Sequence, residues 1–146
     1  MLLSPKAEPN FFDPADFYAF ASWLNLAKPS SSSQALRRTI VGRAYYAALI
    51  CARDATRSST SGGSGHKNVV TALKQKNHTA GSKLDELRLK RQKADYDSEI
   101  LTPREVDIAL RSALVVLQAL GKFVDNTPPY KSDYLDASHF LSAPAT

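Results

Sequence analysis

Small residues recur three and four positions apart between residues 36 and 55, which contain no proline and one glycine. At this spacing they lie on one face of a helix, which another helix could approach closely. The pattern predicts a central helix over residues 36–55 that ends near Arg57. Its small face consists of Ala44, Ala47, Ala48, Cys51 and Ala55.

Amphipathic repeats predict a second helix near the start of the chain. Asp13 is typical of an N-cap and Pro14 of the first helical position. The helix should run to about Ala27, with its inner face formed by Phe17, Phe20, Ala21 and Leu24. Ser31 with Gln34 is expected to cap the central helix that follows.

A third amphipathic repeat has the clearest start signal. Thr102 and Glu105 have the spacing of a capping box, with Pro103 at the first helical position. A narrow apolar seam at intervals of four and three then predicts a long helix. The seam consists of Val106, Leu110, Ala113, Leu117, Leu120 and Val124.

Two shorter helices are predicted between these. A loop over residues 58–65 contains no apolar side chain. The next helix should cover residues 66–77, and residues 77–81 should break it. Ser82 with Asp85 is then expected to cap a helix that ends at about residue 97.

No segment alternates with the period of a strand, so we expect an all-α protein. Four or five helices with antiparallel neighbours should form one bundle over residues 13–126. Residues 1–12 are expected to be an irregular lead-in, and residues 127–146 an extended C-terminal tail.

Length and composition fit a globular domain, since the 146 residues are 43% hydrophobic and 23% charged. The net charge of +5 is uneven: residues 33–57 carry five Arg against one Asp. A basic half indicates a polyanion or an acidic partner, and the alternative is a merely solvated face. The candidate nucleic-acid contacts are Arg37, Arg38, Arg53, Lys67 and Lys74.

Several classes of protein are disfavoured. No apolar run approaches the roughly 20 residues of a membrane span, and the first residues lack the apolar core of a signal peptide. The single cysteine, Cys51, with three histidines makes no zinc site. We therefore expect a cytoplasmic protein with no membrane contact, no metal and no cofactor.

Three stretches, taken in order, resemble the HEPN superfamily, in particular its small stand-alone prokaryotic members. Residues 43–48, Arg-Ala-Tyr-Tyr-Ala-Ala, are similar to its Ser-Arg-Ala-Tyr-Tyr-Ala signature, with Gly42 in place of the serine. Residues 65–70 resemble its Gly-x-His-x-x-Val segment. Residues 84–96 resemble its Leu-x-x-Arg-x-x-Ala-Asp-Tyr segment.

The resemblance implies a four- to five-helix bundle that pairs as a symmetric dimer, in toxin–antitoxin or antiviral defence systems. Many such proteins are metal-independent ribonucleases, and others work beside a small nucleotidyltransferase. The ribonucleases carry an Arg followed, after four to six residues, by a His. No His follows Arg57, Arg88 or Arg91 at this distance, which disfavours nuclease activity.

A displaced catalytic set remains an alternative. Metal-free RNA cleavage needs proton transfer, for which His is suited, and neutralisation of the phosphate, for which Arg is suited. The candidates are Arg88 and Arg91 on one helical face, His66 from the preceding helix, and Tyr96 as a hydroxyl. The structural alternative is that His66 packs at a helix start and Arg91 forms an interior ion pair.

Arg43 and Asp95 suggest a structural role for the signature. Both lie in apolar-rich parts of helices expected to be neighbours, and a buried charge must be paired. We expect Arg43 to pair with Asp95 in a polar clamp, with Tyr45 or Tyr46 donating into the same network.

Three functions therefore stay open. The first is a HEPN-like subunit, dimeric or bound to a partner protein such as a nucleotidyltransferase, with RNA as a further ligand. The second is a metal-independent ribonuclease toxin with a non-standard site. The third is a simple nucleic-acid-binding module, which lacks a recognition or stacking motif here.

Overall fold

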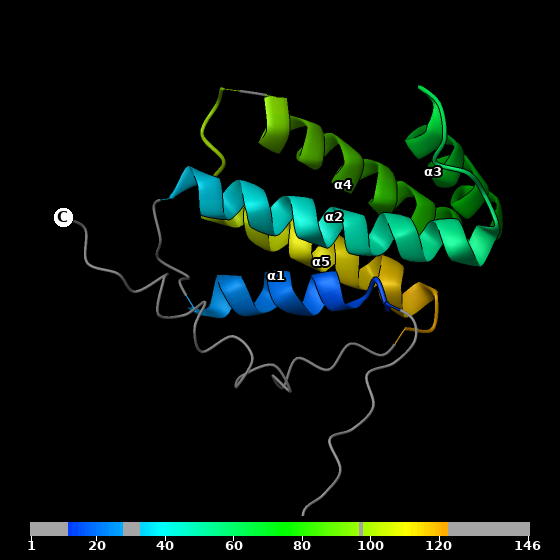
Figure 1. Ribbon diagram of the computed structural model, residues 1–146, viewed down its shortest axis with the longest axis horizontal. Coiled ribbons are helices and arrows are strands. Elements are labelled where there is room, and N and C mark those ends of the chain that lie inside the picture. The colour runs from blue at the N-terminus through cyan, green and yellow to red at the C-terminus, as the bar shows by residue number, and fades with distance from the viewer. Residues whose placement is uncertain (1–11, 28–32, 97, 123–146) are drawn as a thin grey trace, which may run out of the picture.

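The computed structural model describes residues 12–27, 33–96 and 98–122, and these residues form only α-helices (Figure 1). The all-α class predicted from the sequence is thereby confirmed. The helices in chain order are α1 (Asp16–Ala27), α2 (Gln34–Thr56), α3 (Gly65–Lys76), α4 (His78–Tyr96) and α5 (Pro103–Ala119).

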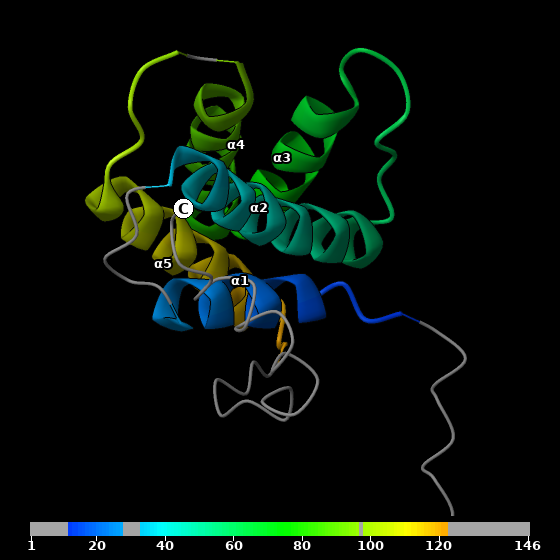
Figure 2. The same cartoon turned by 60° about the vertical axis from the view of Figure 1, so that its left-hand side comes forward.

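Helix α2 is the centre of the bundle and contacts each of the other four helices. Helices α3 and α4 lie on one side of it, and α1 and α5 on the other (Figure 2). Figure 1 shows α2 antiparallel to α1 and to α4, and α5 antiparallel to α4. The predicted antiparallel neighbours are therefore present.

The small face of α2 explains this central place. Ala44, Ala47 and Ala48 are completely buried and Cys51 nearly so, whereas Ala55 is exposed. Burial raises the pKa of the Cys51 thiol to about 11, so it is a packed, protonated residue. Because this face is buried in the core, a larger side chain here would overpack it, at a typical cost of about 1–3 kcal/mol.

The predicted start signal holds for α5 and in part for α1, which begins at Asp16, two residues after Pro14, and it needs correction for α2. Asp13 Oδ1 accepts from the Ala15 amide at 3.0 Å, and Thr102 Oγ1 accepts from the Glu105 amide at 3.2 Å. The N-cap of α2 is Ser33, whose hydroxyl accepts from the Leu36 amide, and not Ser31.

Gln34, predicted as a capping residue, instead ties α2 to the loop before α5. Its amide nitrogen donates to the Leu101 carbonyl at 3.0 Å, and its amide oxygen accepts from the Leu101 amide at 2.8 Å. These two bonds satisfy both backbone groups of Leu101, which is completely buried.

The predicted start of α4 is wrong: the helix begins five residues earlier, with Asn77 and not Ser82 as its cap. Asn77 ends α3 and also starts α4, because its backbone N–H donates to Leu73 and its side chain accepts from the Ala80 amide at 3.0 Å. Gly81 does not interrupt the helix there. It lies inside α4 at a close approach of α3, since a Cβ on Gly81 would meet the Lys74 backbone nitrogen at 2.6 Å.

Helix α5 ends where a glycine permits a left-handed turn. Gly121 has φ +73°, and the amides of Gly121 and Lys122 donate to the carbonyls of Gln118 and Leu117, which is a Schellman motif. The predicted seam faces the core as far as Leu120, which is partly buried. Val124, the irregular lead-in as far as residue 11, and the tail over 127–146 lie outside the described residues.

None of the helices that the described residues form combines the length and the apolar composition needed to cross a bilayer.

Candidate functional site

A cavity of about 250 Å³ opens between the first turn of α3, the loop before it, and the side of α4 that carries Arg88, Arg91 and Gln92. Its size is below the roughly 300–1,000 Å³ of sites that enclose a whole small molecule, and it therefore suits a phosphate or a sugar–phosphate group. Its lining residues are Thr60, Gly62, Gly63, His66, Lys67, Arg88, Arg91 and Gln92.

Two glycines shape the loop so that His66 enters the cavity at the start of α3. Gly62 has φ +82°, a left-handed conformation that glycine adopts without strain. Gly65 lies so close to the Thr60 backbone that a Cβ would meet the Thr60 Cα at 2.7 Å. The glycine before His66 is therefore a steric requirement of this loop.

The ring of His66 is held from the core by Tyr45 of α2. The Tyr45 hydroxyl lies 2.9 Å from His66 Nδ1, and the Tyr45 side chain is completely buried. Burial raises the pKa of Tyr45 to about 12, against the lowering effect of Arg91 and Arg88, so the phenol keeps its proton. With the phenol as donor, Nδ1 accepts and the proton of the neutral imidazole resides on Nε2.

His66 is kept neutral by its surroundings. Burial lowers its pKa from 6.5, and the positive charges of Arg91 and Arg88 lower it further. At pH 7 the ring is therefore uncharged.

Arg91 connects the cavity to the two tyrosines of α2. Its Nη2 donates to the Tyr46 hydroxyl at 3.2 Å, and its Nε lies 2.8 Å from Asp95 Oδ2. The enclosed Nε–H is not aligned for a hydrogen bond, so the contact with Asp95 is an ion pair. Asp95 thus neutralises part of the charge that Arg91 brings to the cavity.

Arg88 is oriented in the same way by an acid one turn earlier on its own helix. Its Nε and Nη2 both lie 3.0 Å from Asp85 Oδ1. Because each arginine has an acid on one side, both guanidinium groups are held in place at the cavity wall.

The predicted clamp between Arg43 and Asp95 is wrong. Asp95 pairs with Arg91, and the Arg43 guanidinium lies between two aromatic rings, 5.2 Å from the Phe17 centroid and 5.4 Å from that of Tyr46. The charge of Arg43 is therefore stabilised by π faces from α1 and α2. Of the predicted network, Tyr46 contacts both Arg43 and Arg91, whereas the Tyr45 hydroxyl is hydrogen-bonded to His66.

Arg37 and Arg38 are not the open surface cations that the sequence indicated. Arg37 Nη1 donates to the Leu101 carbonyl at 3.0 Å. Arg38 donates to the carbonyls of Lys93, Ala94 and Glu99 around the end of α4. Cations at a helix C-terminus interact favourably with its orphan carbonyls, so both residues fix the α4–α5 connection.

The other predicted nucleic-acid contacts differ from one another. Lys67 is exposed and lines the cavity. Arg53 pairs with its neighbour Asp54 at 3.0 Å on the surface. Lys74 lies under the α3–α4 turn, beside Gly81, and does not line the cavity.

Tyr96 lies next to the cavity, not in it. The residue is 79% exposed, and its ring centroid is 5.8 Å from the Arg91 guanidinium carbon. A neighbouring hollow contains Tyr96 together with Gln92, which also lines the cavity. An exposed aromatic ring in this position is available for stacking.

The structure therefore brings together three of the four candidate catalytic residues, His66, Arg88 and Arg91, with Tyr96 at the rim. Sequence reasoning missed the orienting acid Asp85, although its spacing of three from Arg88 is a signal. It also missed Gln92 and the loop residues Thr60, Gly62 and Gly63, for which the sequence offers no comparable signal.

Chemically, the cavity is a set of converging donors. It combines two oriented guanidinium groups, the Lys67 ammonium and a neutral imidazole. Such donors suit a phosphate, which accepts bidentate bonds from arginine. No cluster of three or more metal-ligating side chains occurs within residues 12–27, 33–96 and 98–122.

No family model, curated protein or solved structure matches this chain.

Proposed function

We propose that this protein is a HEPN-like, dimeric, cytoplasmic subunit of a toxin–antitoxin or antiviral defence system. It binds a partner protein, such as a nucleotidyltransferase, and binds RNA through a phosphate in the His66–Arg88–Arg91 cavity. One observation supports it above the others. The three stretches on which the resemblance rests converge here through the bonds Tyr45–His66 and Arg91–Tyr46.

Binding is a better use of this site than cleavage. Where the Tyr45 phenol donates to Nδ1, the imidazole proton resides on Nε2, and His66 then offers the cavity a hydrogen-bond donor and no free lone pair. A general base would need that lone pair directed at the 2′-hydroxyl. The site therefore supports neutralising and holding a phosphate.

The test is RNA binding by matched arginine pairs. A fluorescein-labelled single-stranded RNA is titrated with the full chain and the anisotropy measured at several salt concentrations. We expect the Arg88→Ala/Arg91→Ala variant to bind at least about tenfold more weakly and to show a shallower salt dependence. The control is Arg104→Ala/Arg111→Ala, which removes the same charge from α5, outside the cavity.

An equal loss of RNA affinity in both double variants would mean that RNA binding depends only on the net charge of the protein. That result would contradict a phosphate site in the cavity.

The metal-independent ribonuclease is the second candidate, and one observation favours it. A neutral His66 lies beside two guanidinium groups, which are the groups that proton transfer and phosphate neutralisation require. The test is incubation of labelled RNA with the protein in EDTA. Cleavage that disappears in both His66→Ala and Arg91→Ala supports the enzyme, and intact RNA supports the binding subunit.

A further inference from the structure

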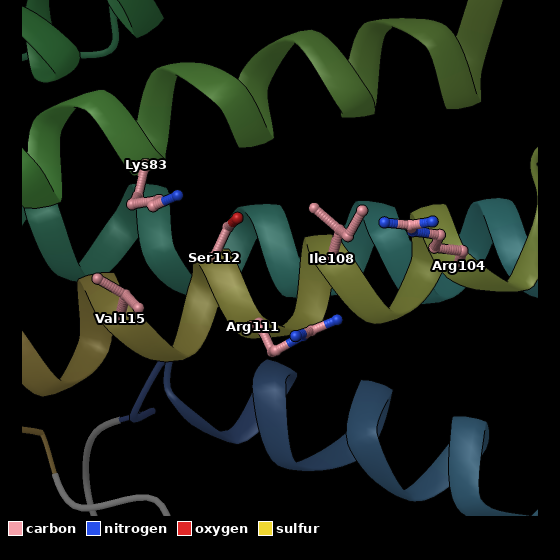
Figure 3. A pocket seen from close by; sticks show the side chains of 6 residues that line it. All are labelled: Lys83, Arg104, Ile108, Arg111, Ser112 and Val115. Carbon is pink, nitrogen blue, oxygen red and sulfur yellow. The ribbon is translucent and has the colours of Figure 1, made fainter.

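A long groove follows the outer face of the bundle between α4 and α5. It consists of two adjoining hollows of about 340 and 360 Å³ that share Ile108 and Ser112. Figure 3 shows the first of them, with five lining residues on α5 and Lys83 reaching in from α4. None of its lining residues belongs to the His66–Arg88–Arg91 cavity.

The floor of this α4–α5 groove is largely apolar, with one serine, Ser112, between the apolar residues. Ile108, Ser112 and Val115 are spaced at i, i+4 and i+7, so they form one stripe along α5. Val115 is 36% exposed, and Leu89 of α4 beside the stripe is 53% exposed. The core-facing seam of α5 is a different set of residues. Ser112 is buried, so the part of this second stripe that is available to another helix is Val115 with the partly exposed Ile108.

The rim of the groove is basic. Lys83, Lys90 and Lys93 come from α4, and Arg104 and Arg111 from α5, against the single lining acid Glu86. The lysines have acids nearby: Lys83 pairs with Glu86, and Lys90 and Lys93 with Glu105. In Figure 3, Lys83 and Arg111 lie on opposite sides of the apolar stripe.

The two arginines differ from the lysines. Arg104 and Arg111 are exposed, and within the described ranges neither has an ion pair or a hydrogen bond from its side chain. They are seven residues apart on α5, the same interval as Ile108 and Val115. Two arginines without a partner among the described residues thus lie alongside the apolar stripe, in line with the helix axis.

We propose that the α4–α5 groove binds an acidic amphipathic helix of a partner protein. From Arg104 to Val115 the groove is about 16 Å long, or three helical turns. Apolar side chains of the partner, spaced at i, i+4 and i+7, lie on Leu89, Ile108 and Val115. Its flanking carboxylates accept from Arg104 and Arg111.

Other occupants fit the groove less well. A second copy of this chain related by a two-fold axis would place the same basic rim against itself, and like charges in contact repel. RNA would satisfy the arginines, but a phosphate backbone gains nothing from an apolar floor. Only an occupant that is both acidic and apolar matches the floor and the rim together.

The inference goes beyond the proposed function and rests on different residues. The protein could lack any affinity for RNA and still bind such a helix, or the reverse. The variant pairs Arg88/Arg91 and Arg104/Arg111 therefore separate the two ideas in one set of measurements.

The probe is a fluorescein-labelled, end-capped peptide of about 18 residues, with leucines at i, i+4 and i+7 and glutamates on both flanks. Its control replaces every glutamate by lysine. Anisotropy is measured with the full chain at low and at high salt. We expect saturable binding of the acidic peptide, at least about tenfold tighter than the lysine peptide, and weaker at high salt.

Variants locate the site. We expect Arg104→Glu/Arg111→Glu to lower affinity for the acidic peptide at least about tenfold, and Val115→Glu to do the same through the floor. Arg88→Ala/Arg91→Ala and Leu26→Glu are the controls, since they change charge in the cavity and an exposed leucine on α1. All of these positions are at least partly exposed, and circular dichroism checks that each variant is folded.

Four results would overturn the proposal. The first is no saturable binding, or equal binding of the two peptides. The second is wild-type affinity in both Arg104→Glu/Arg111→Glu and Val115→Glu. The third is self-association of the free chain that Val115→Glu abolishes, which would assign the groove to a second copy. RNA binding that depends on Arg104 and Arg111 and not on Val115 would likewise assign it to nucleic acid.

Discussion

The Tyr45 hydroxyl lies 2.9 Å from Nδ1 of His66, and this contact joins the buried middle of α2 to the first turn of α3. A phenol that keeps its proton can direct the imidazole proton to the opposite nitrogen. The tautomer of the one histidine in the cavity is thus coupled to a hydroxyl that solvent does not reach.

We expect Tyr45→Phe to remove this control with little change in packing. The loss of one part-buried hydrogen bond should lower the free energy of unfolding by about 1 kcal/mol. The imidazole ¹⁵N shifts of His66 should change from those of a predominantly Nε2–H tautomer to those of a mixture. Tyr46→Phe is the matched control, and its His66 shifts should stay as in the wild type.

The pH dependence of stability should reveal His66. Burial, Arg91 and Arg88 place its folded-state pKa below the unfolded value of about 6.5. The unfolded state therefore binds the proton first as the pH falls, so this contribution is complete above pH 6.5 and is lost between pH 6.5 and the lower folded pKa.

The measurement is urea unfolding at several pH values beside an NMR titration of His66. His66→Gln should flatten the change in stability just below pH 6.5. Arg91→Ala should raise the pKa of His66, because a neighbouring positive charge is removed. A His66 pKa that stays the same in Arg91→Ala would contradict the electrostatic coupling.

Removing the acid partner of Arg91 should leave stability almost unchanged but should increase RNA affinity. Asp95 is 36% exposed in its side chain, and exposed ion pairs contribute about 0–1 kcal/mol, so Asp95→Ala should change the melting temperature little. RNA affinity should increase severalfold, because the cavity loses a nearby negative charge. Asp54→Ala, which removes an acid beside Arg53 on the surface, should leave RNA affinity unchanged.

Local signals account for most of what the sequence predicted about the fold. The capping box Thr102–Glu105 and the small face of α2 depend on residues three and four apart, so they can be read without knowing the neighbours. Residues 77–81 resemble the end of a helix when only such local signals are considered. Gly81 is required by the approach of α3, a contact that only the folded chain supplies.

The site could be predicted in part, for a related reason. A buried charge needs compensation, which the sequence indicates, but it does not say whether the partner is a carboxylate or a π face. Arg43 has Phe17 and Tyr46, and Asp95 is left for Arg91 on its own helix. Similarly, the basic character of Arg38 is evident in the sequence, whereas the carbonyls that it binds come from residues 93–99.

Arg38 should prove important for stability. It donates to the Ala94 carbonyl at 2.6 Å and the Glu99 carbonyl at 2.7 Å, and charged hydrogen bonds contribute about 1.5–3 kcal/mol each. We expect Arg38→Ala to lower the free energy of unfolding by about 2–3 kcal/mol in urea. Arg38→Lys should not restore it, because an ammonium cannot reproduce the planar fork.

Arg53→Ala is the matched control on the same helix, and it should cost less than about 1 kcal/mol as an exposed pair. A small effect of Arg38→Ala would contradict the assignment of this residue to the end of α4.

Two helical glycines should respond to alanine in opposite directions. Both Gly42 in α2 and Gly81 in α4 lie inside helices, where glycine is worse than alanine by about 0.5–1 kcal/mol because of its backbone entropy. A Cβ on Gly42 would meet nothing within 4 Å, so Gly42→Ala should raise the free energy of unfolding by that amount. A Cβ on Gly81 would lie 2.6 Å from the Lys74 backbone nitrogen, so Gly81→Ala should force α3 and α4 apart and lower stability by about 1–3 kcal/mol. Urea unfolding of the two variants measures both effects, and a loss of stability in Gly42→Ala would mean that its face of α2 is packed more tightly than described.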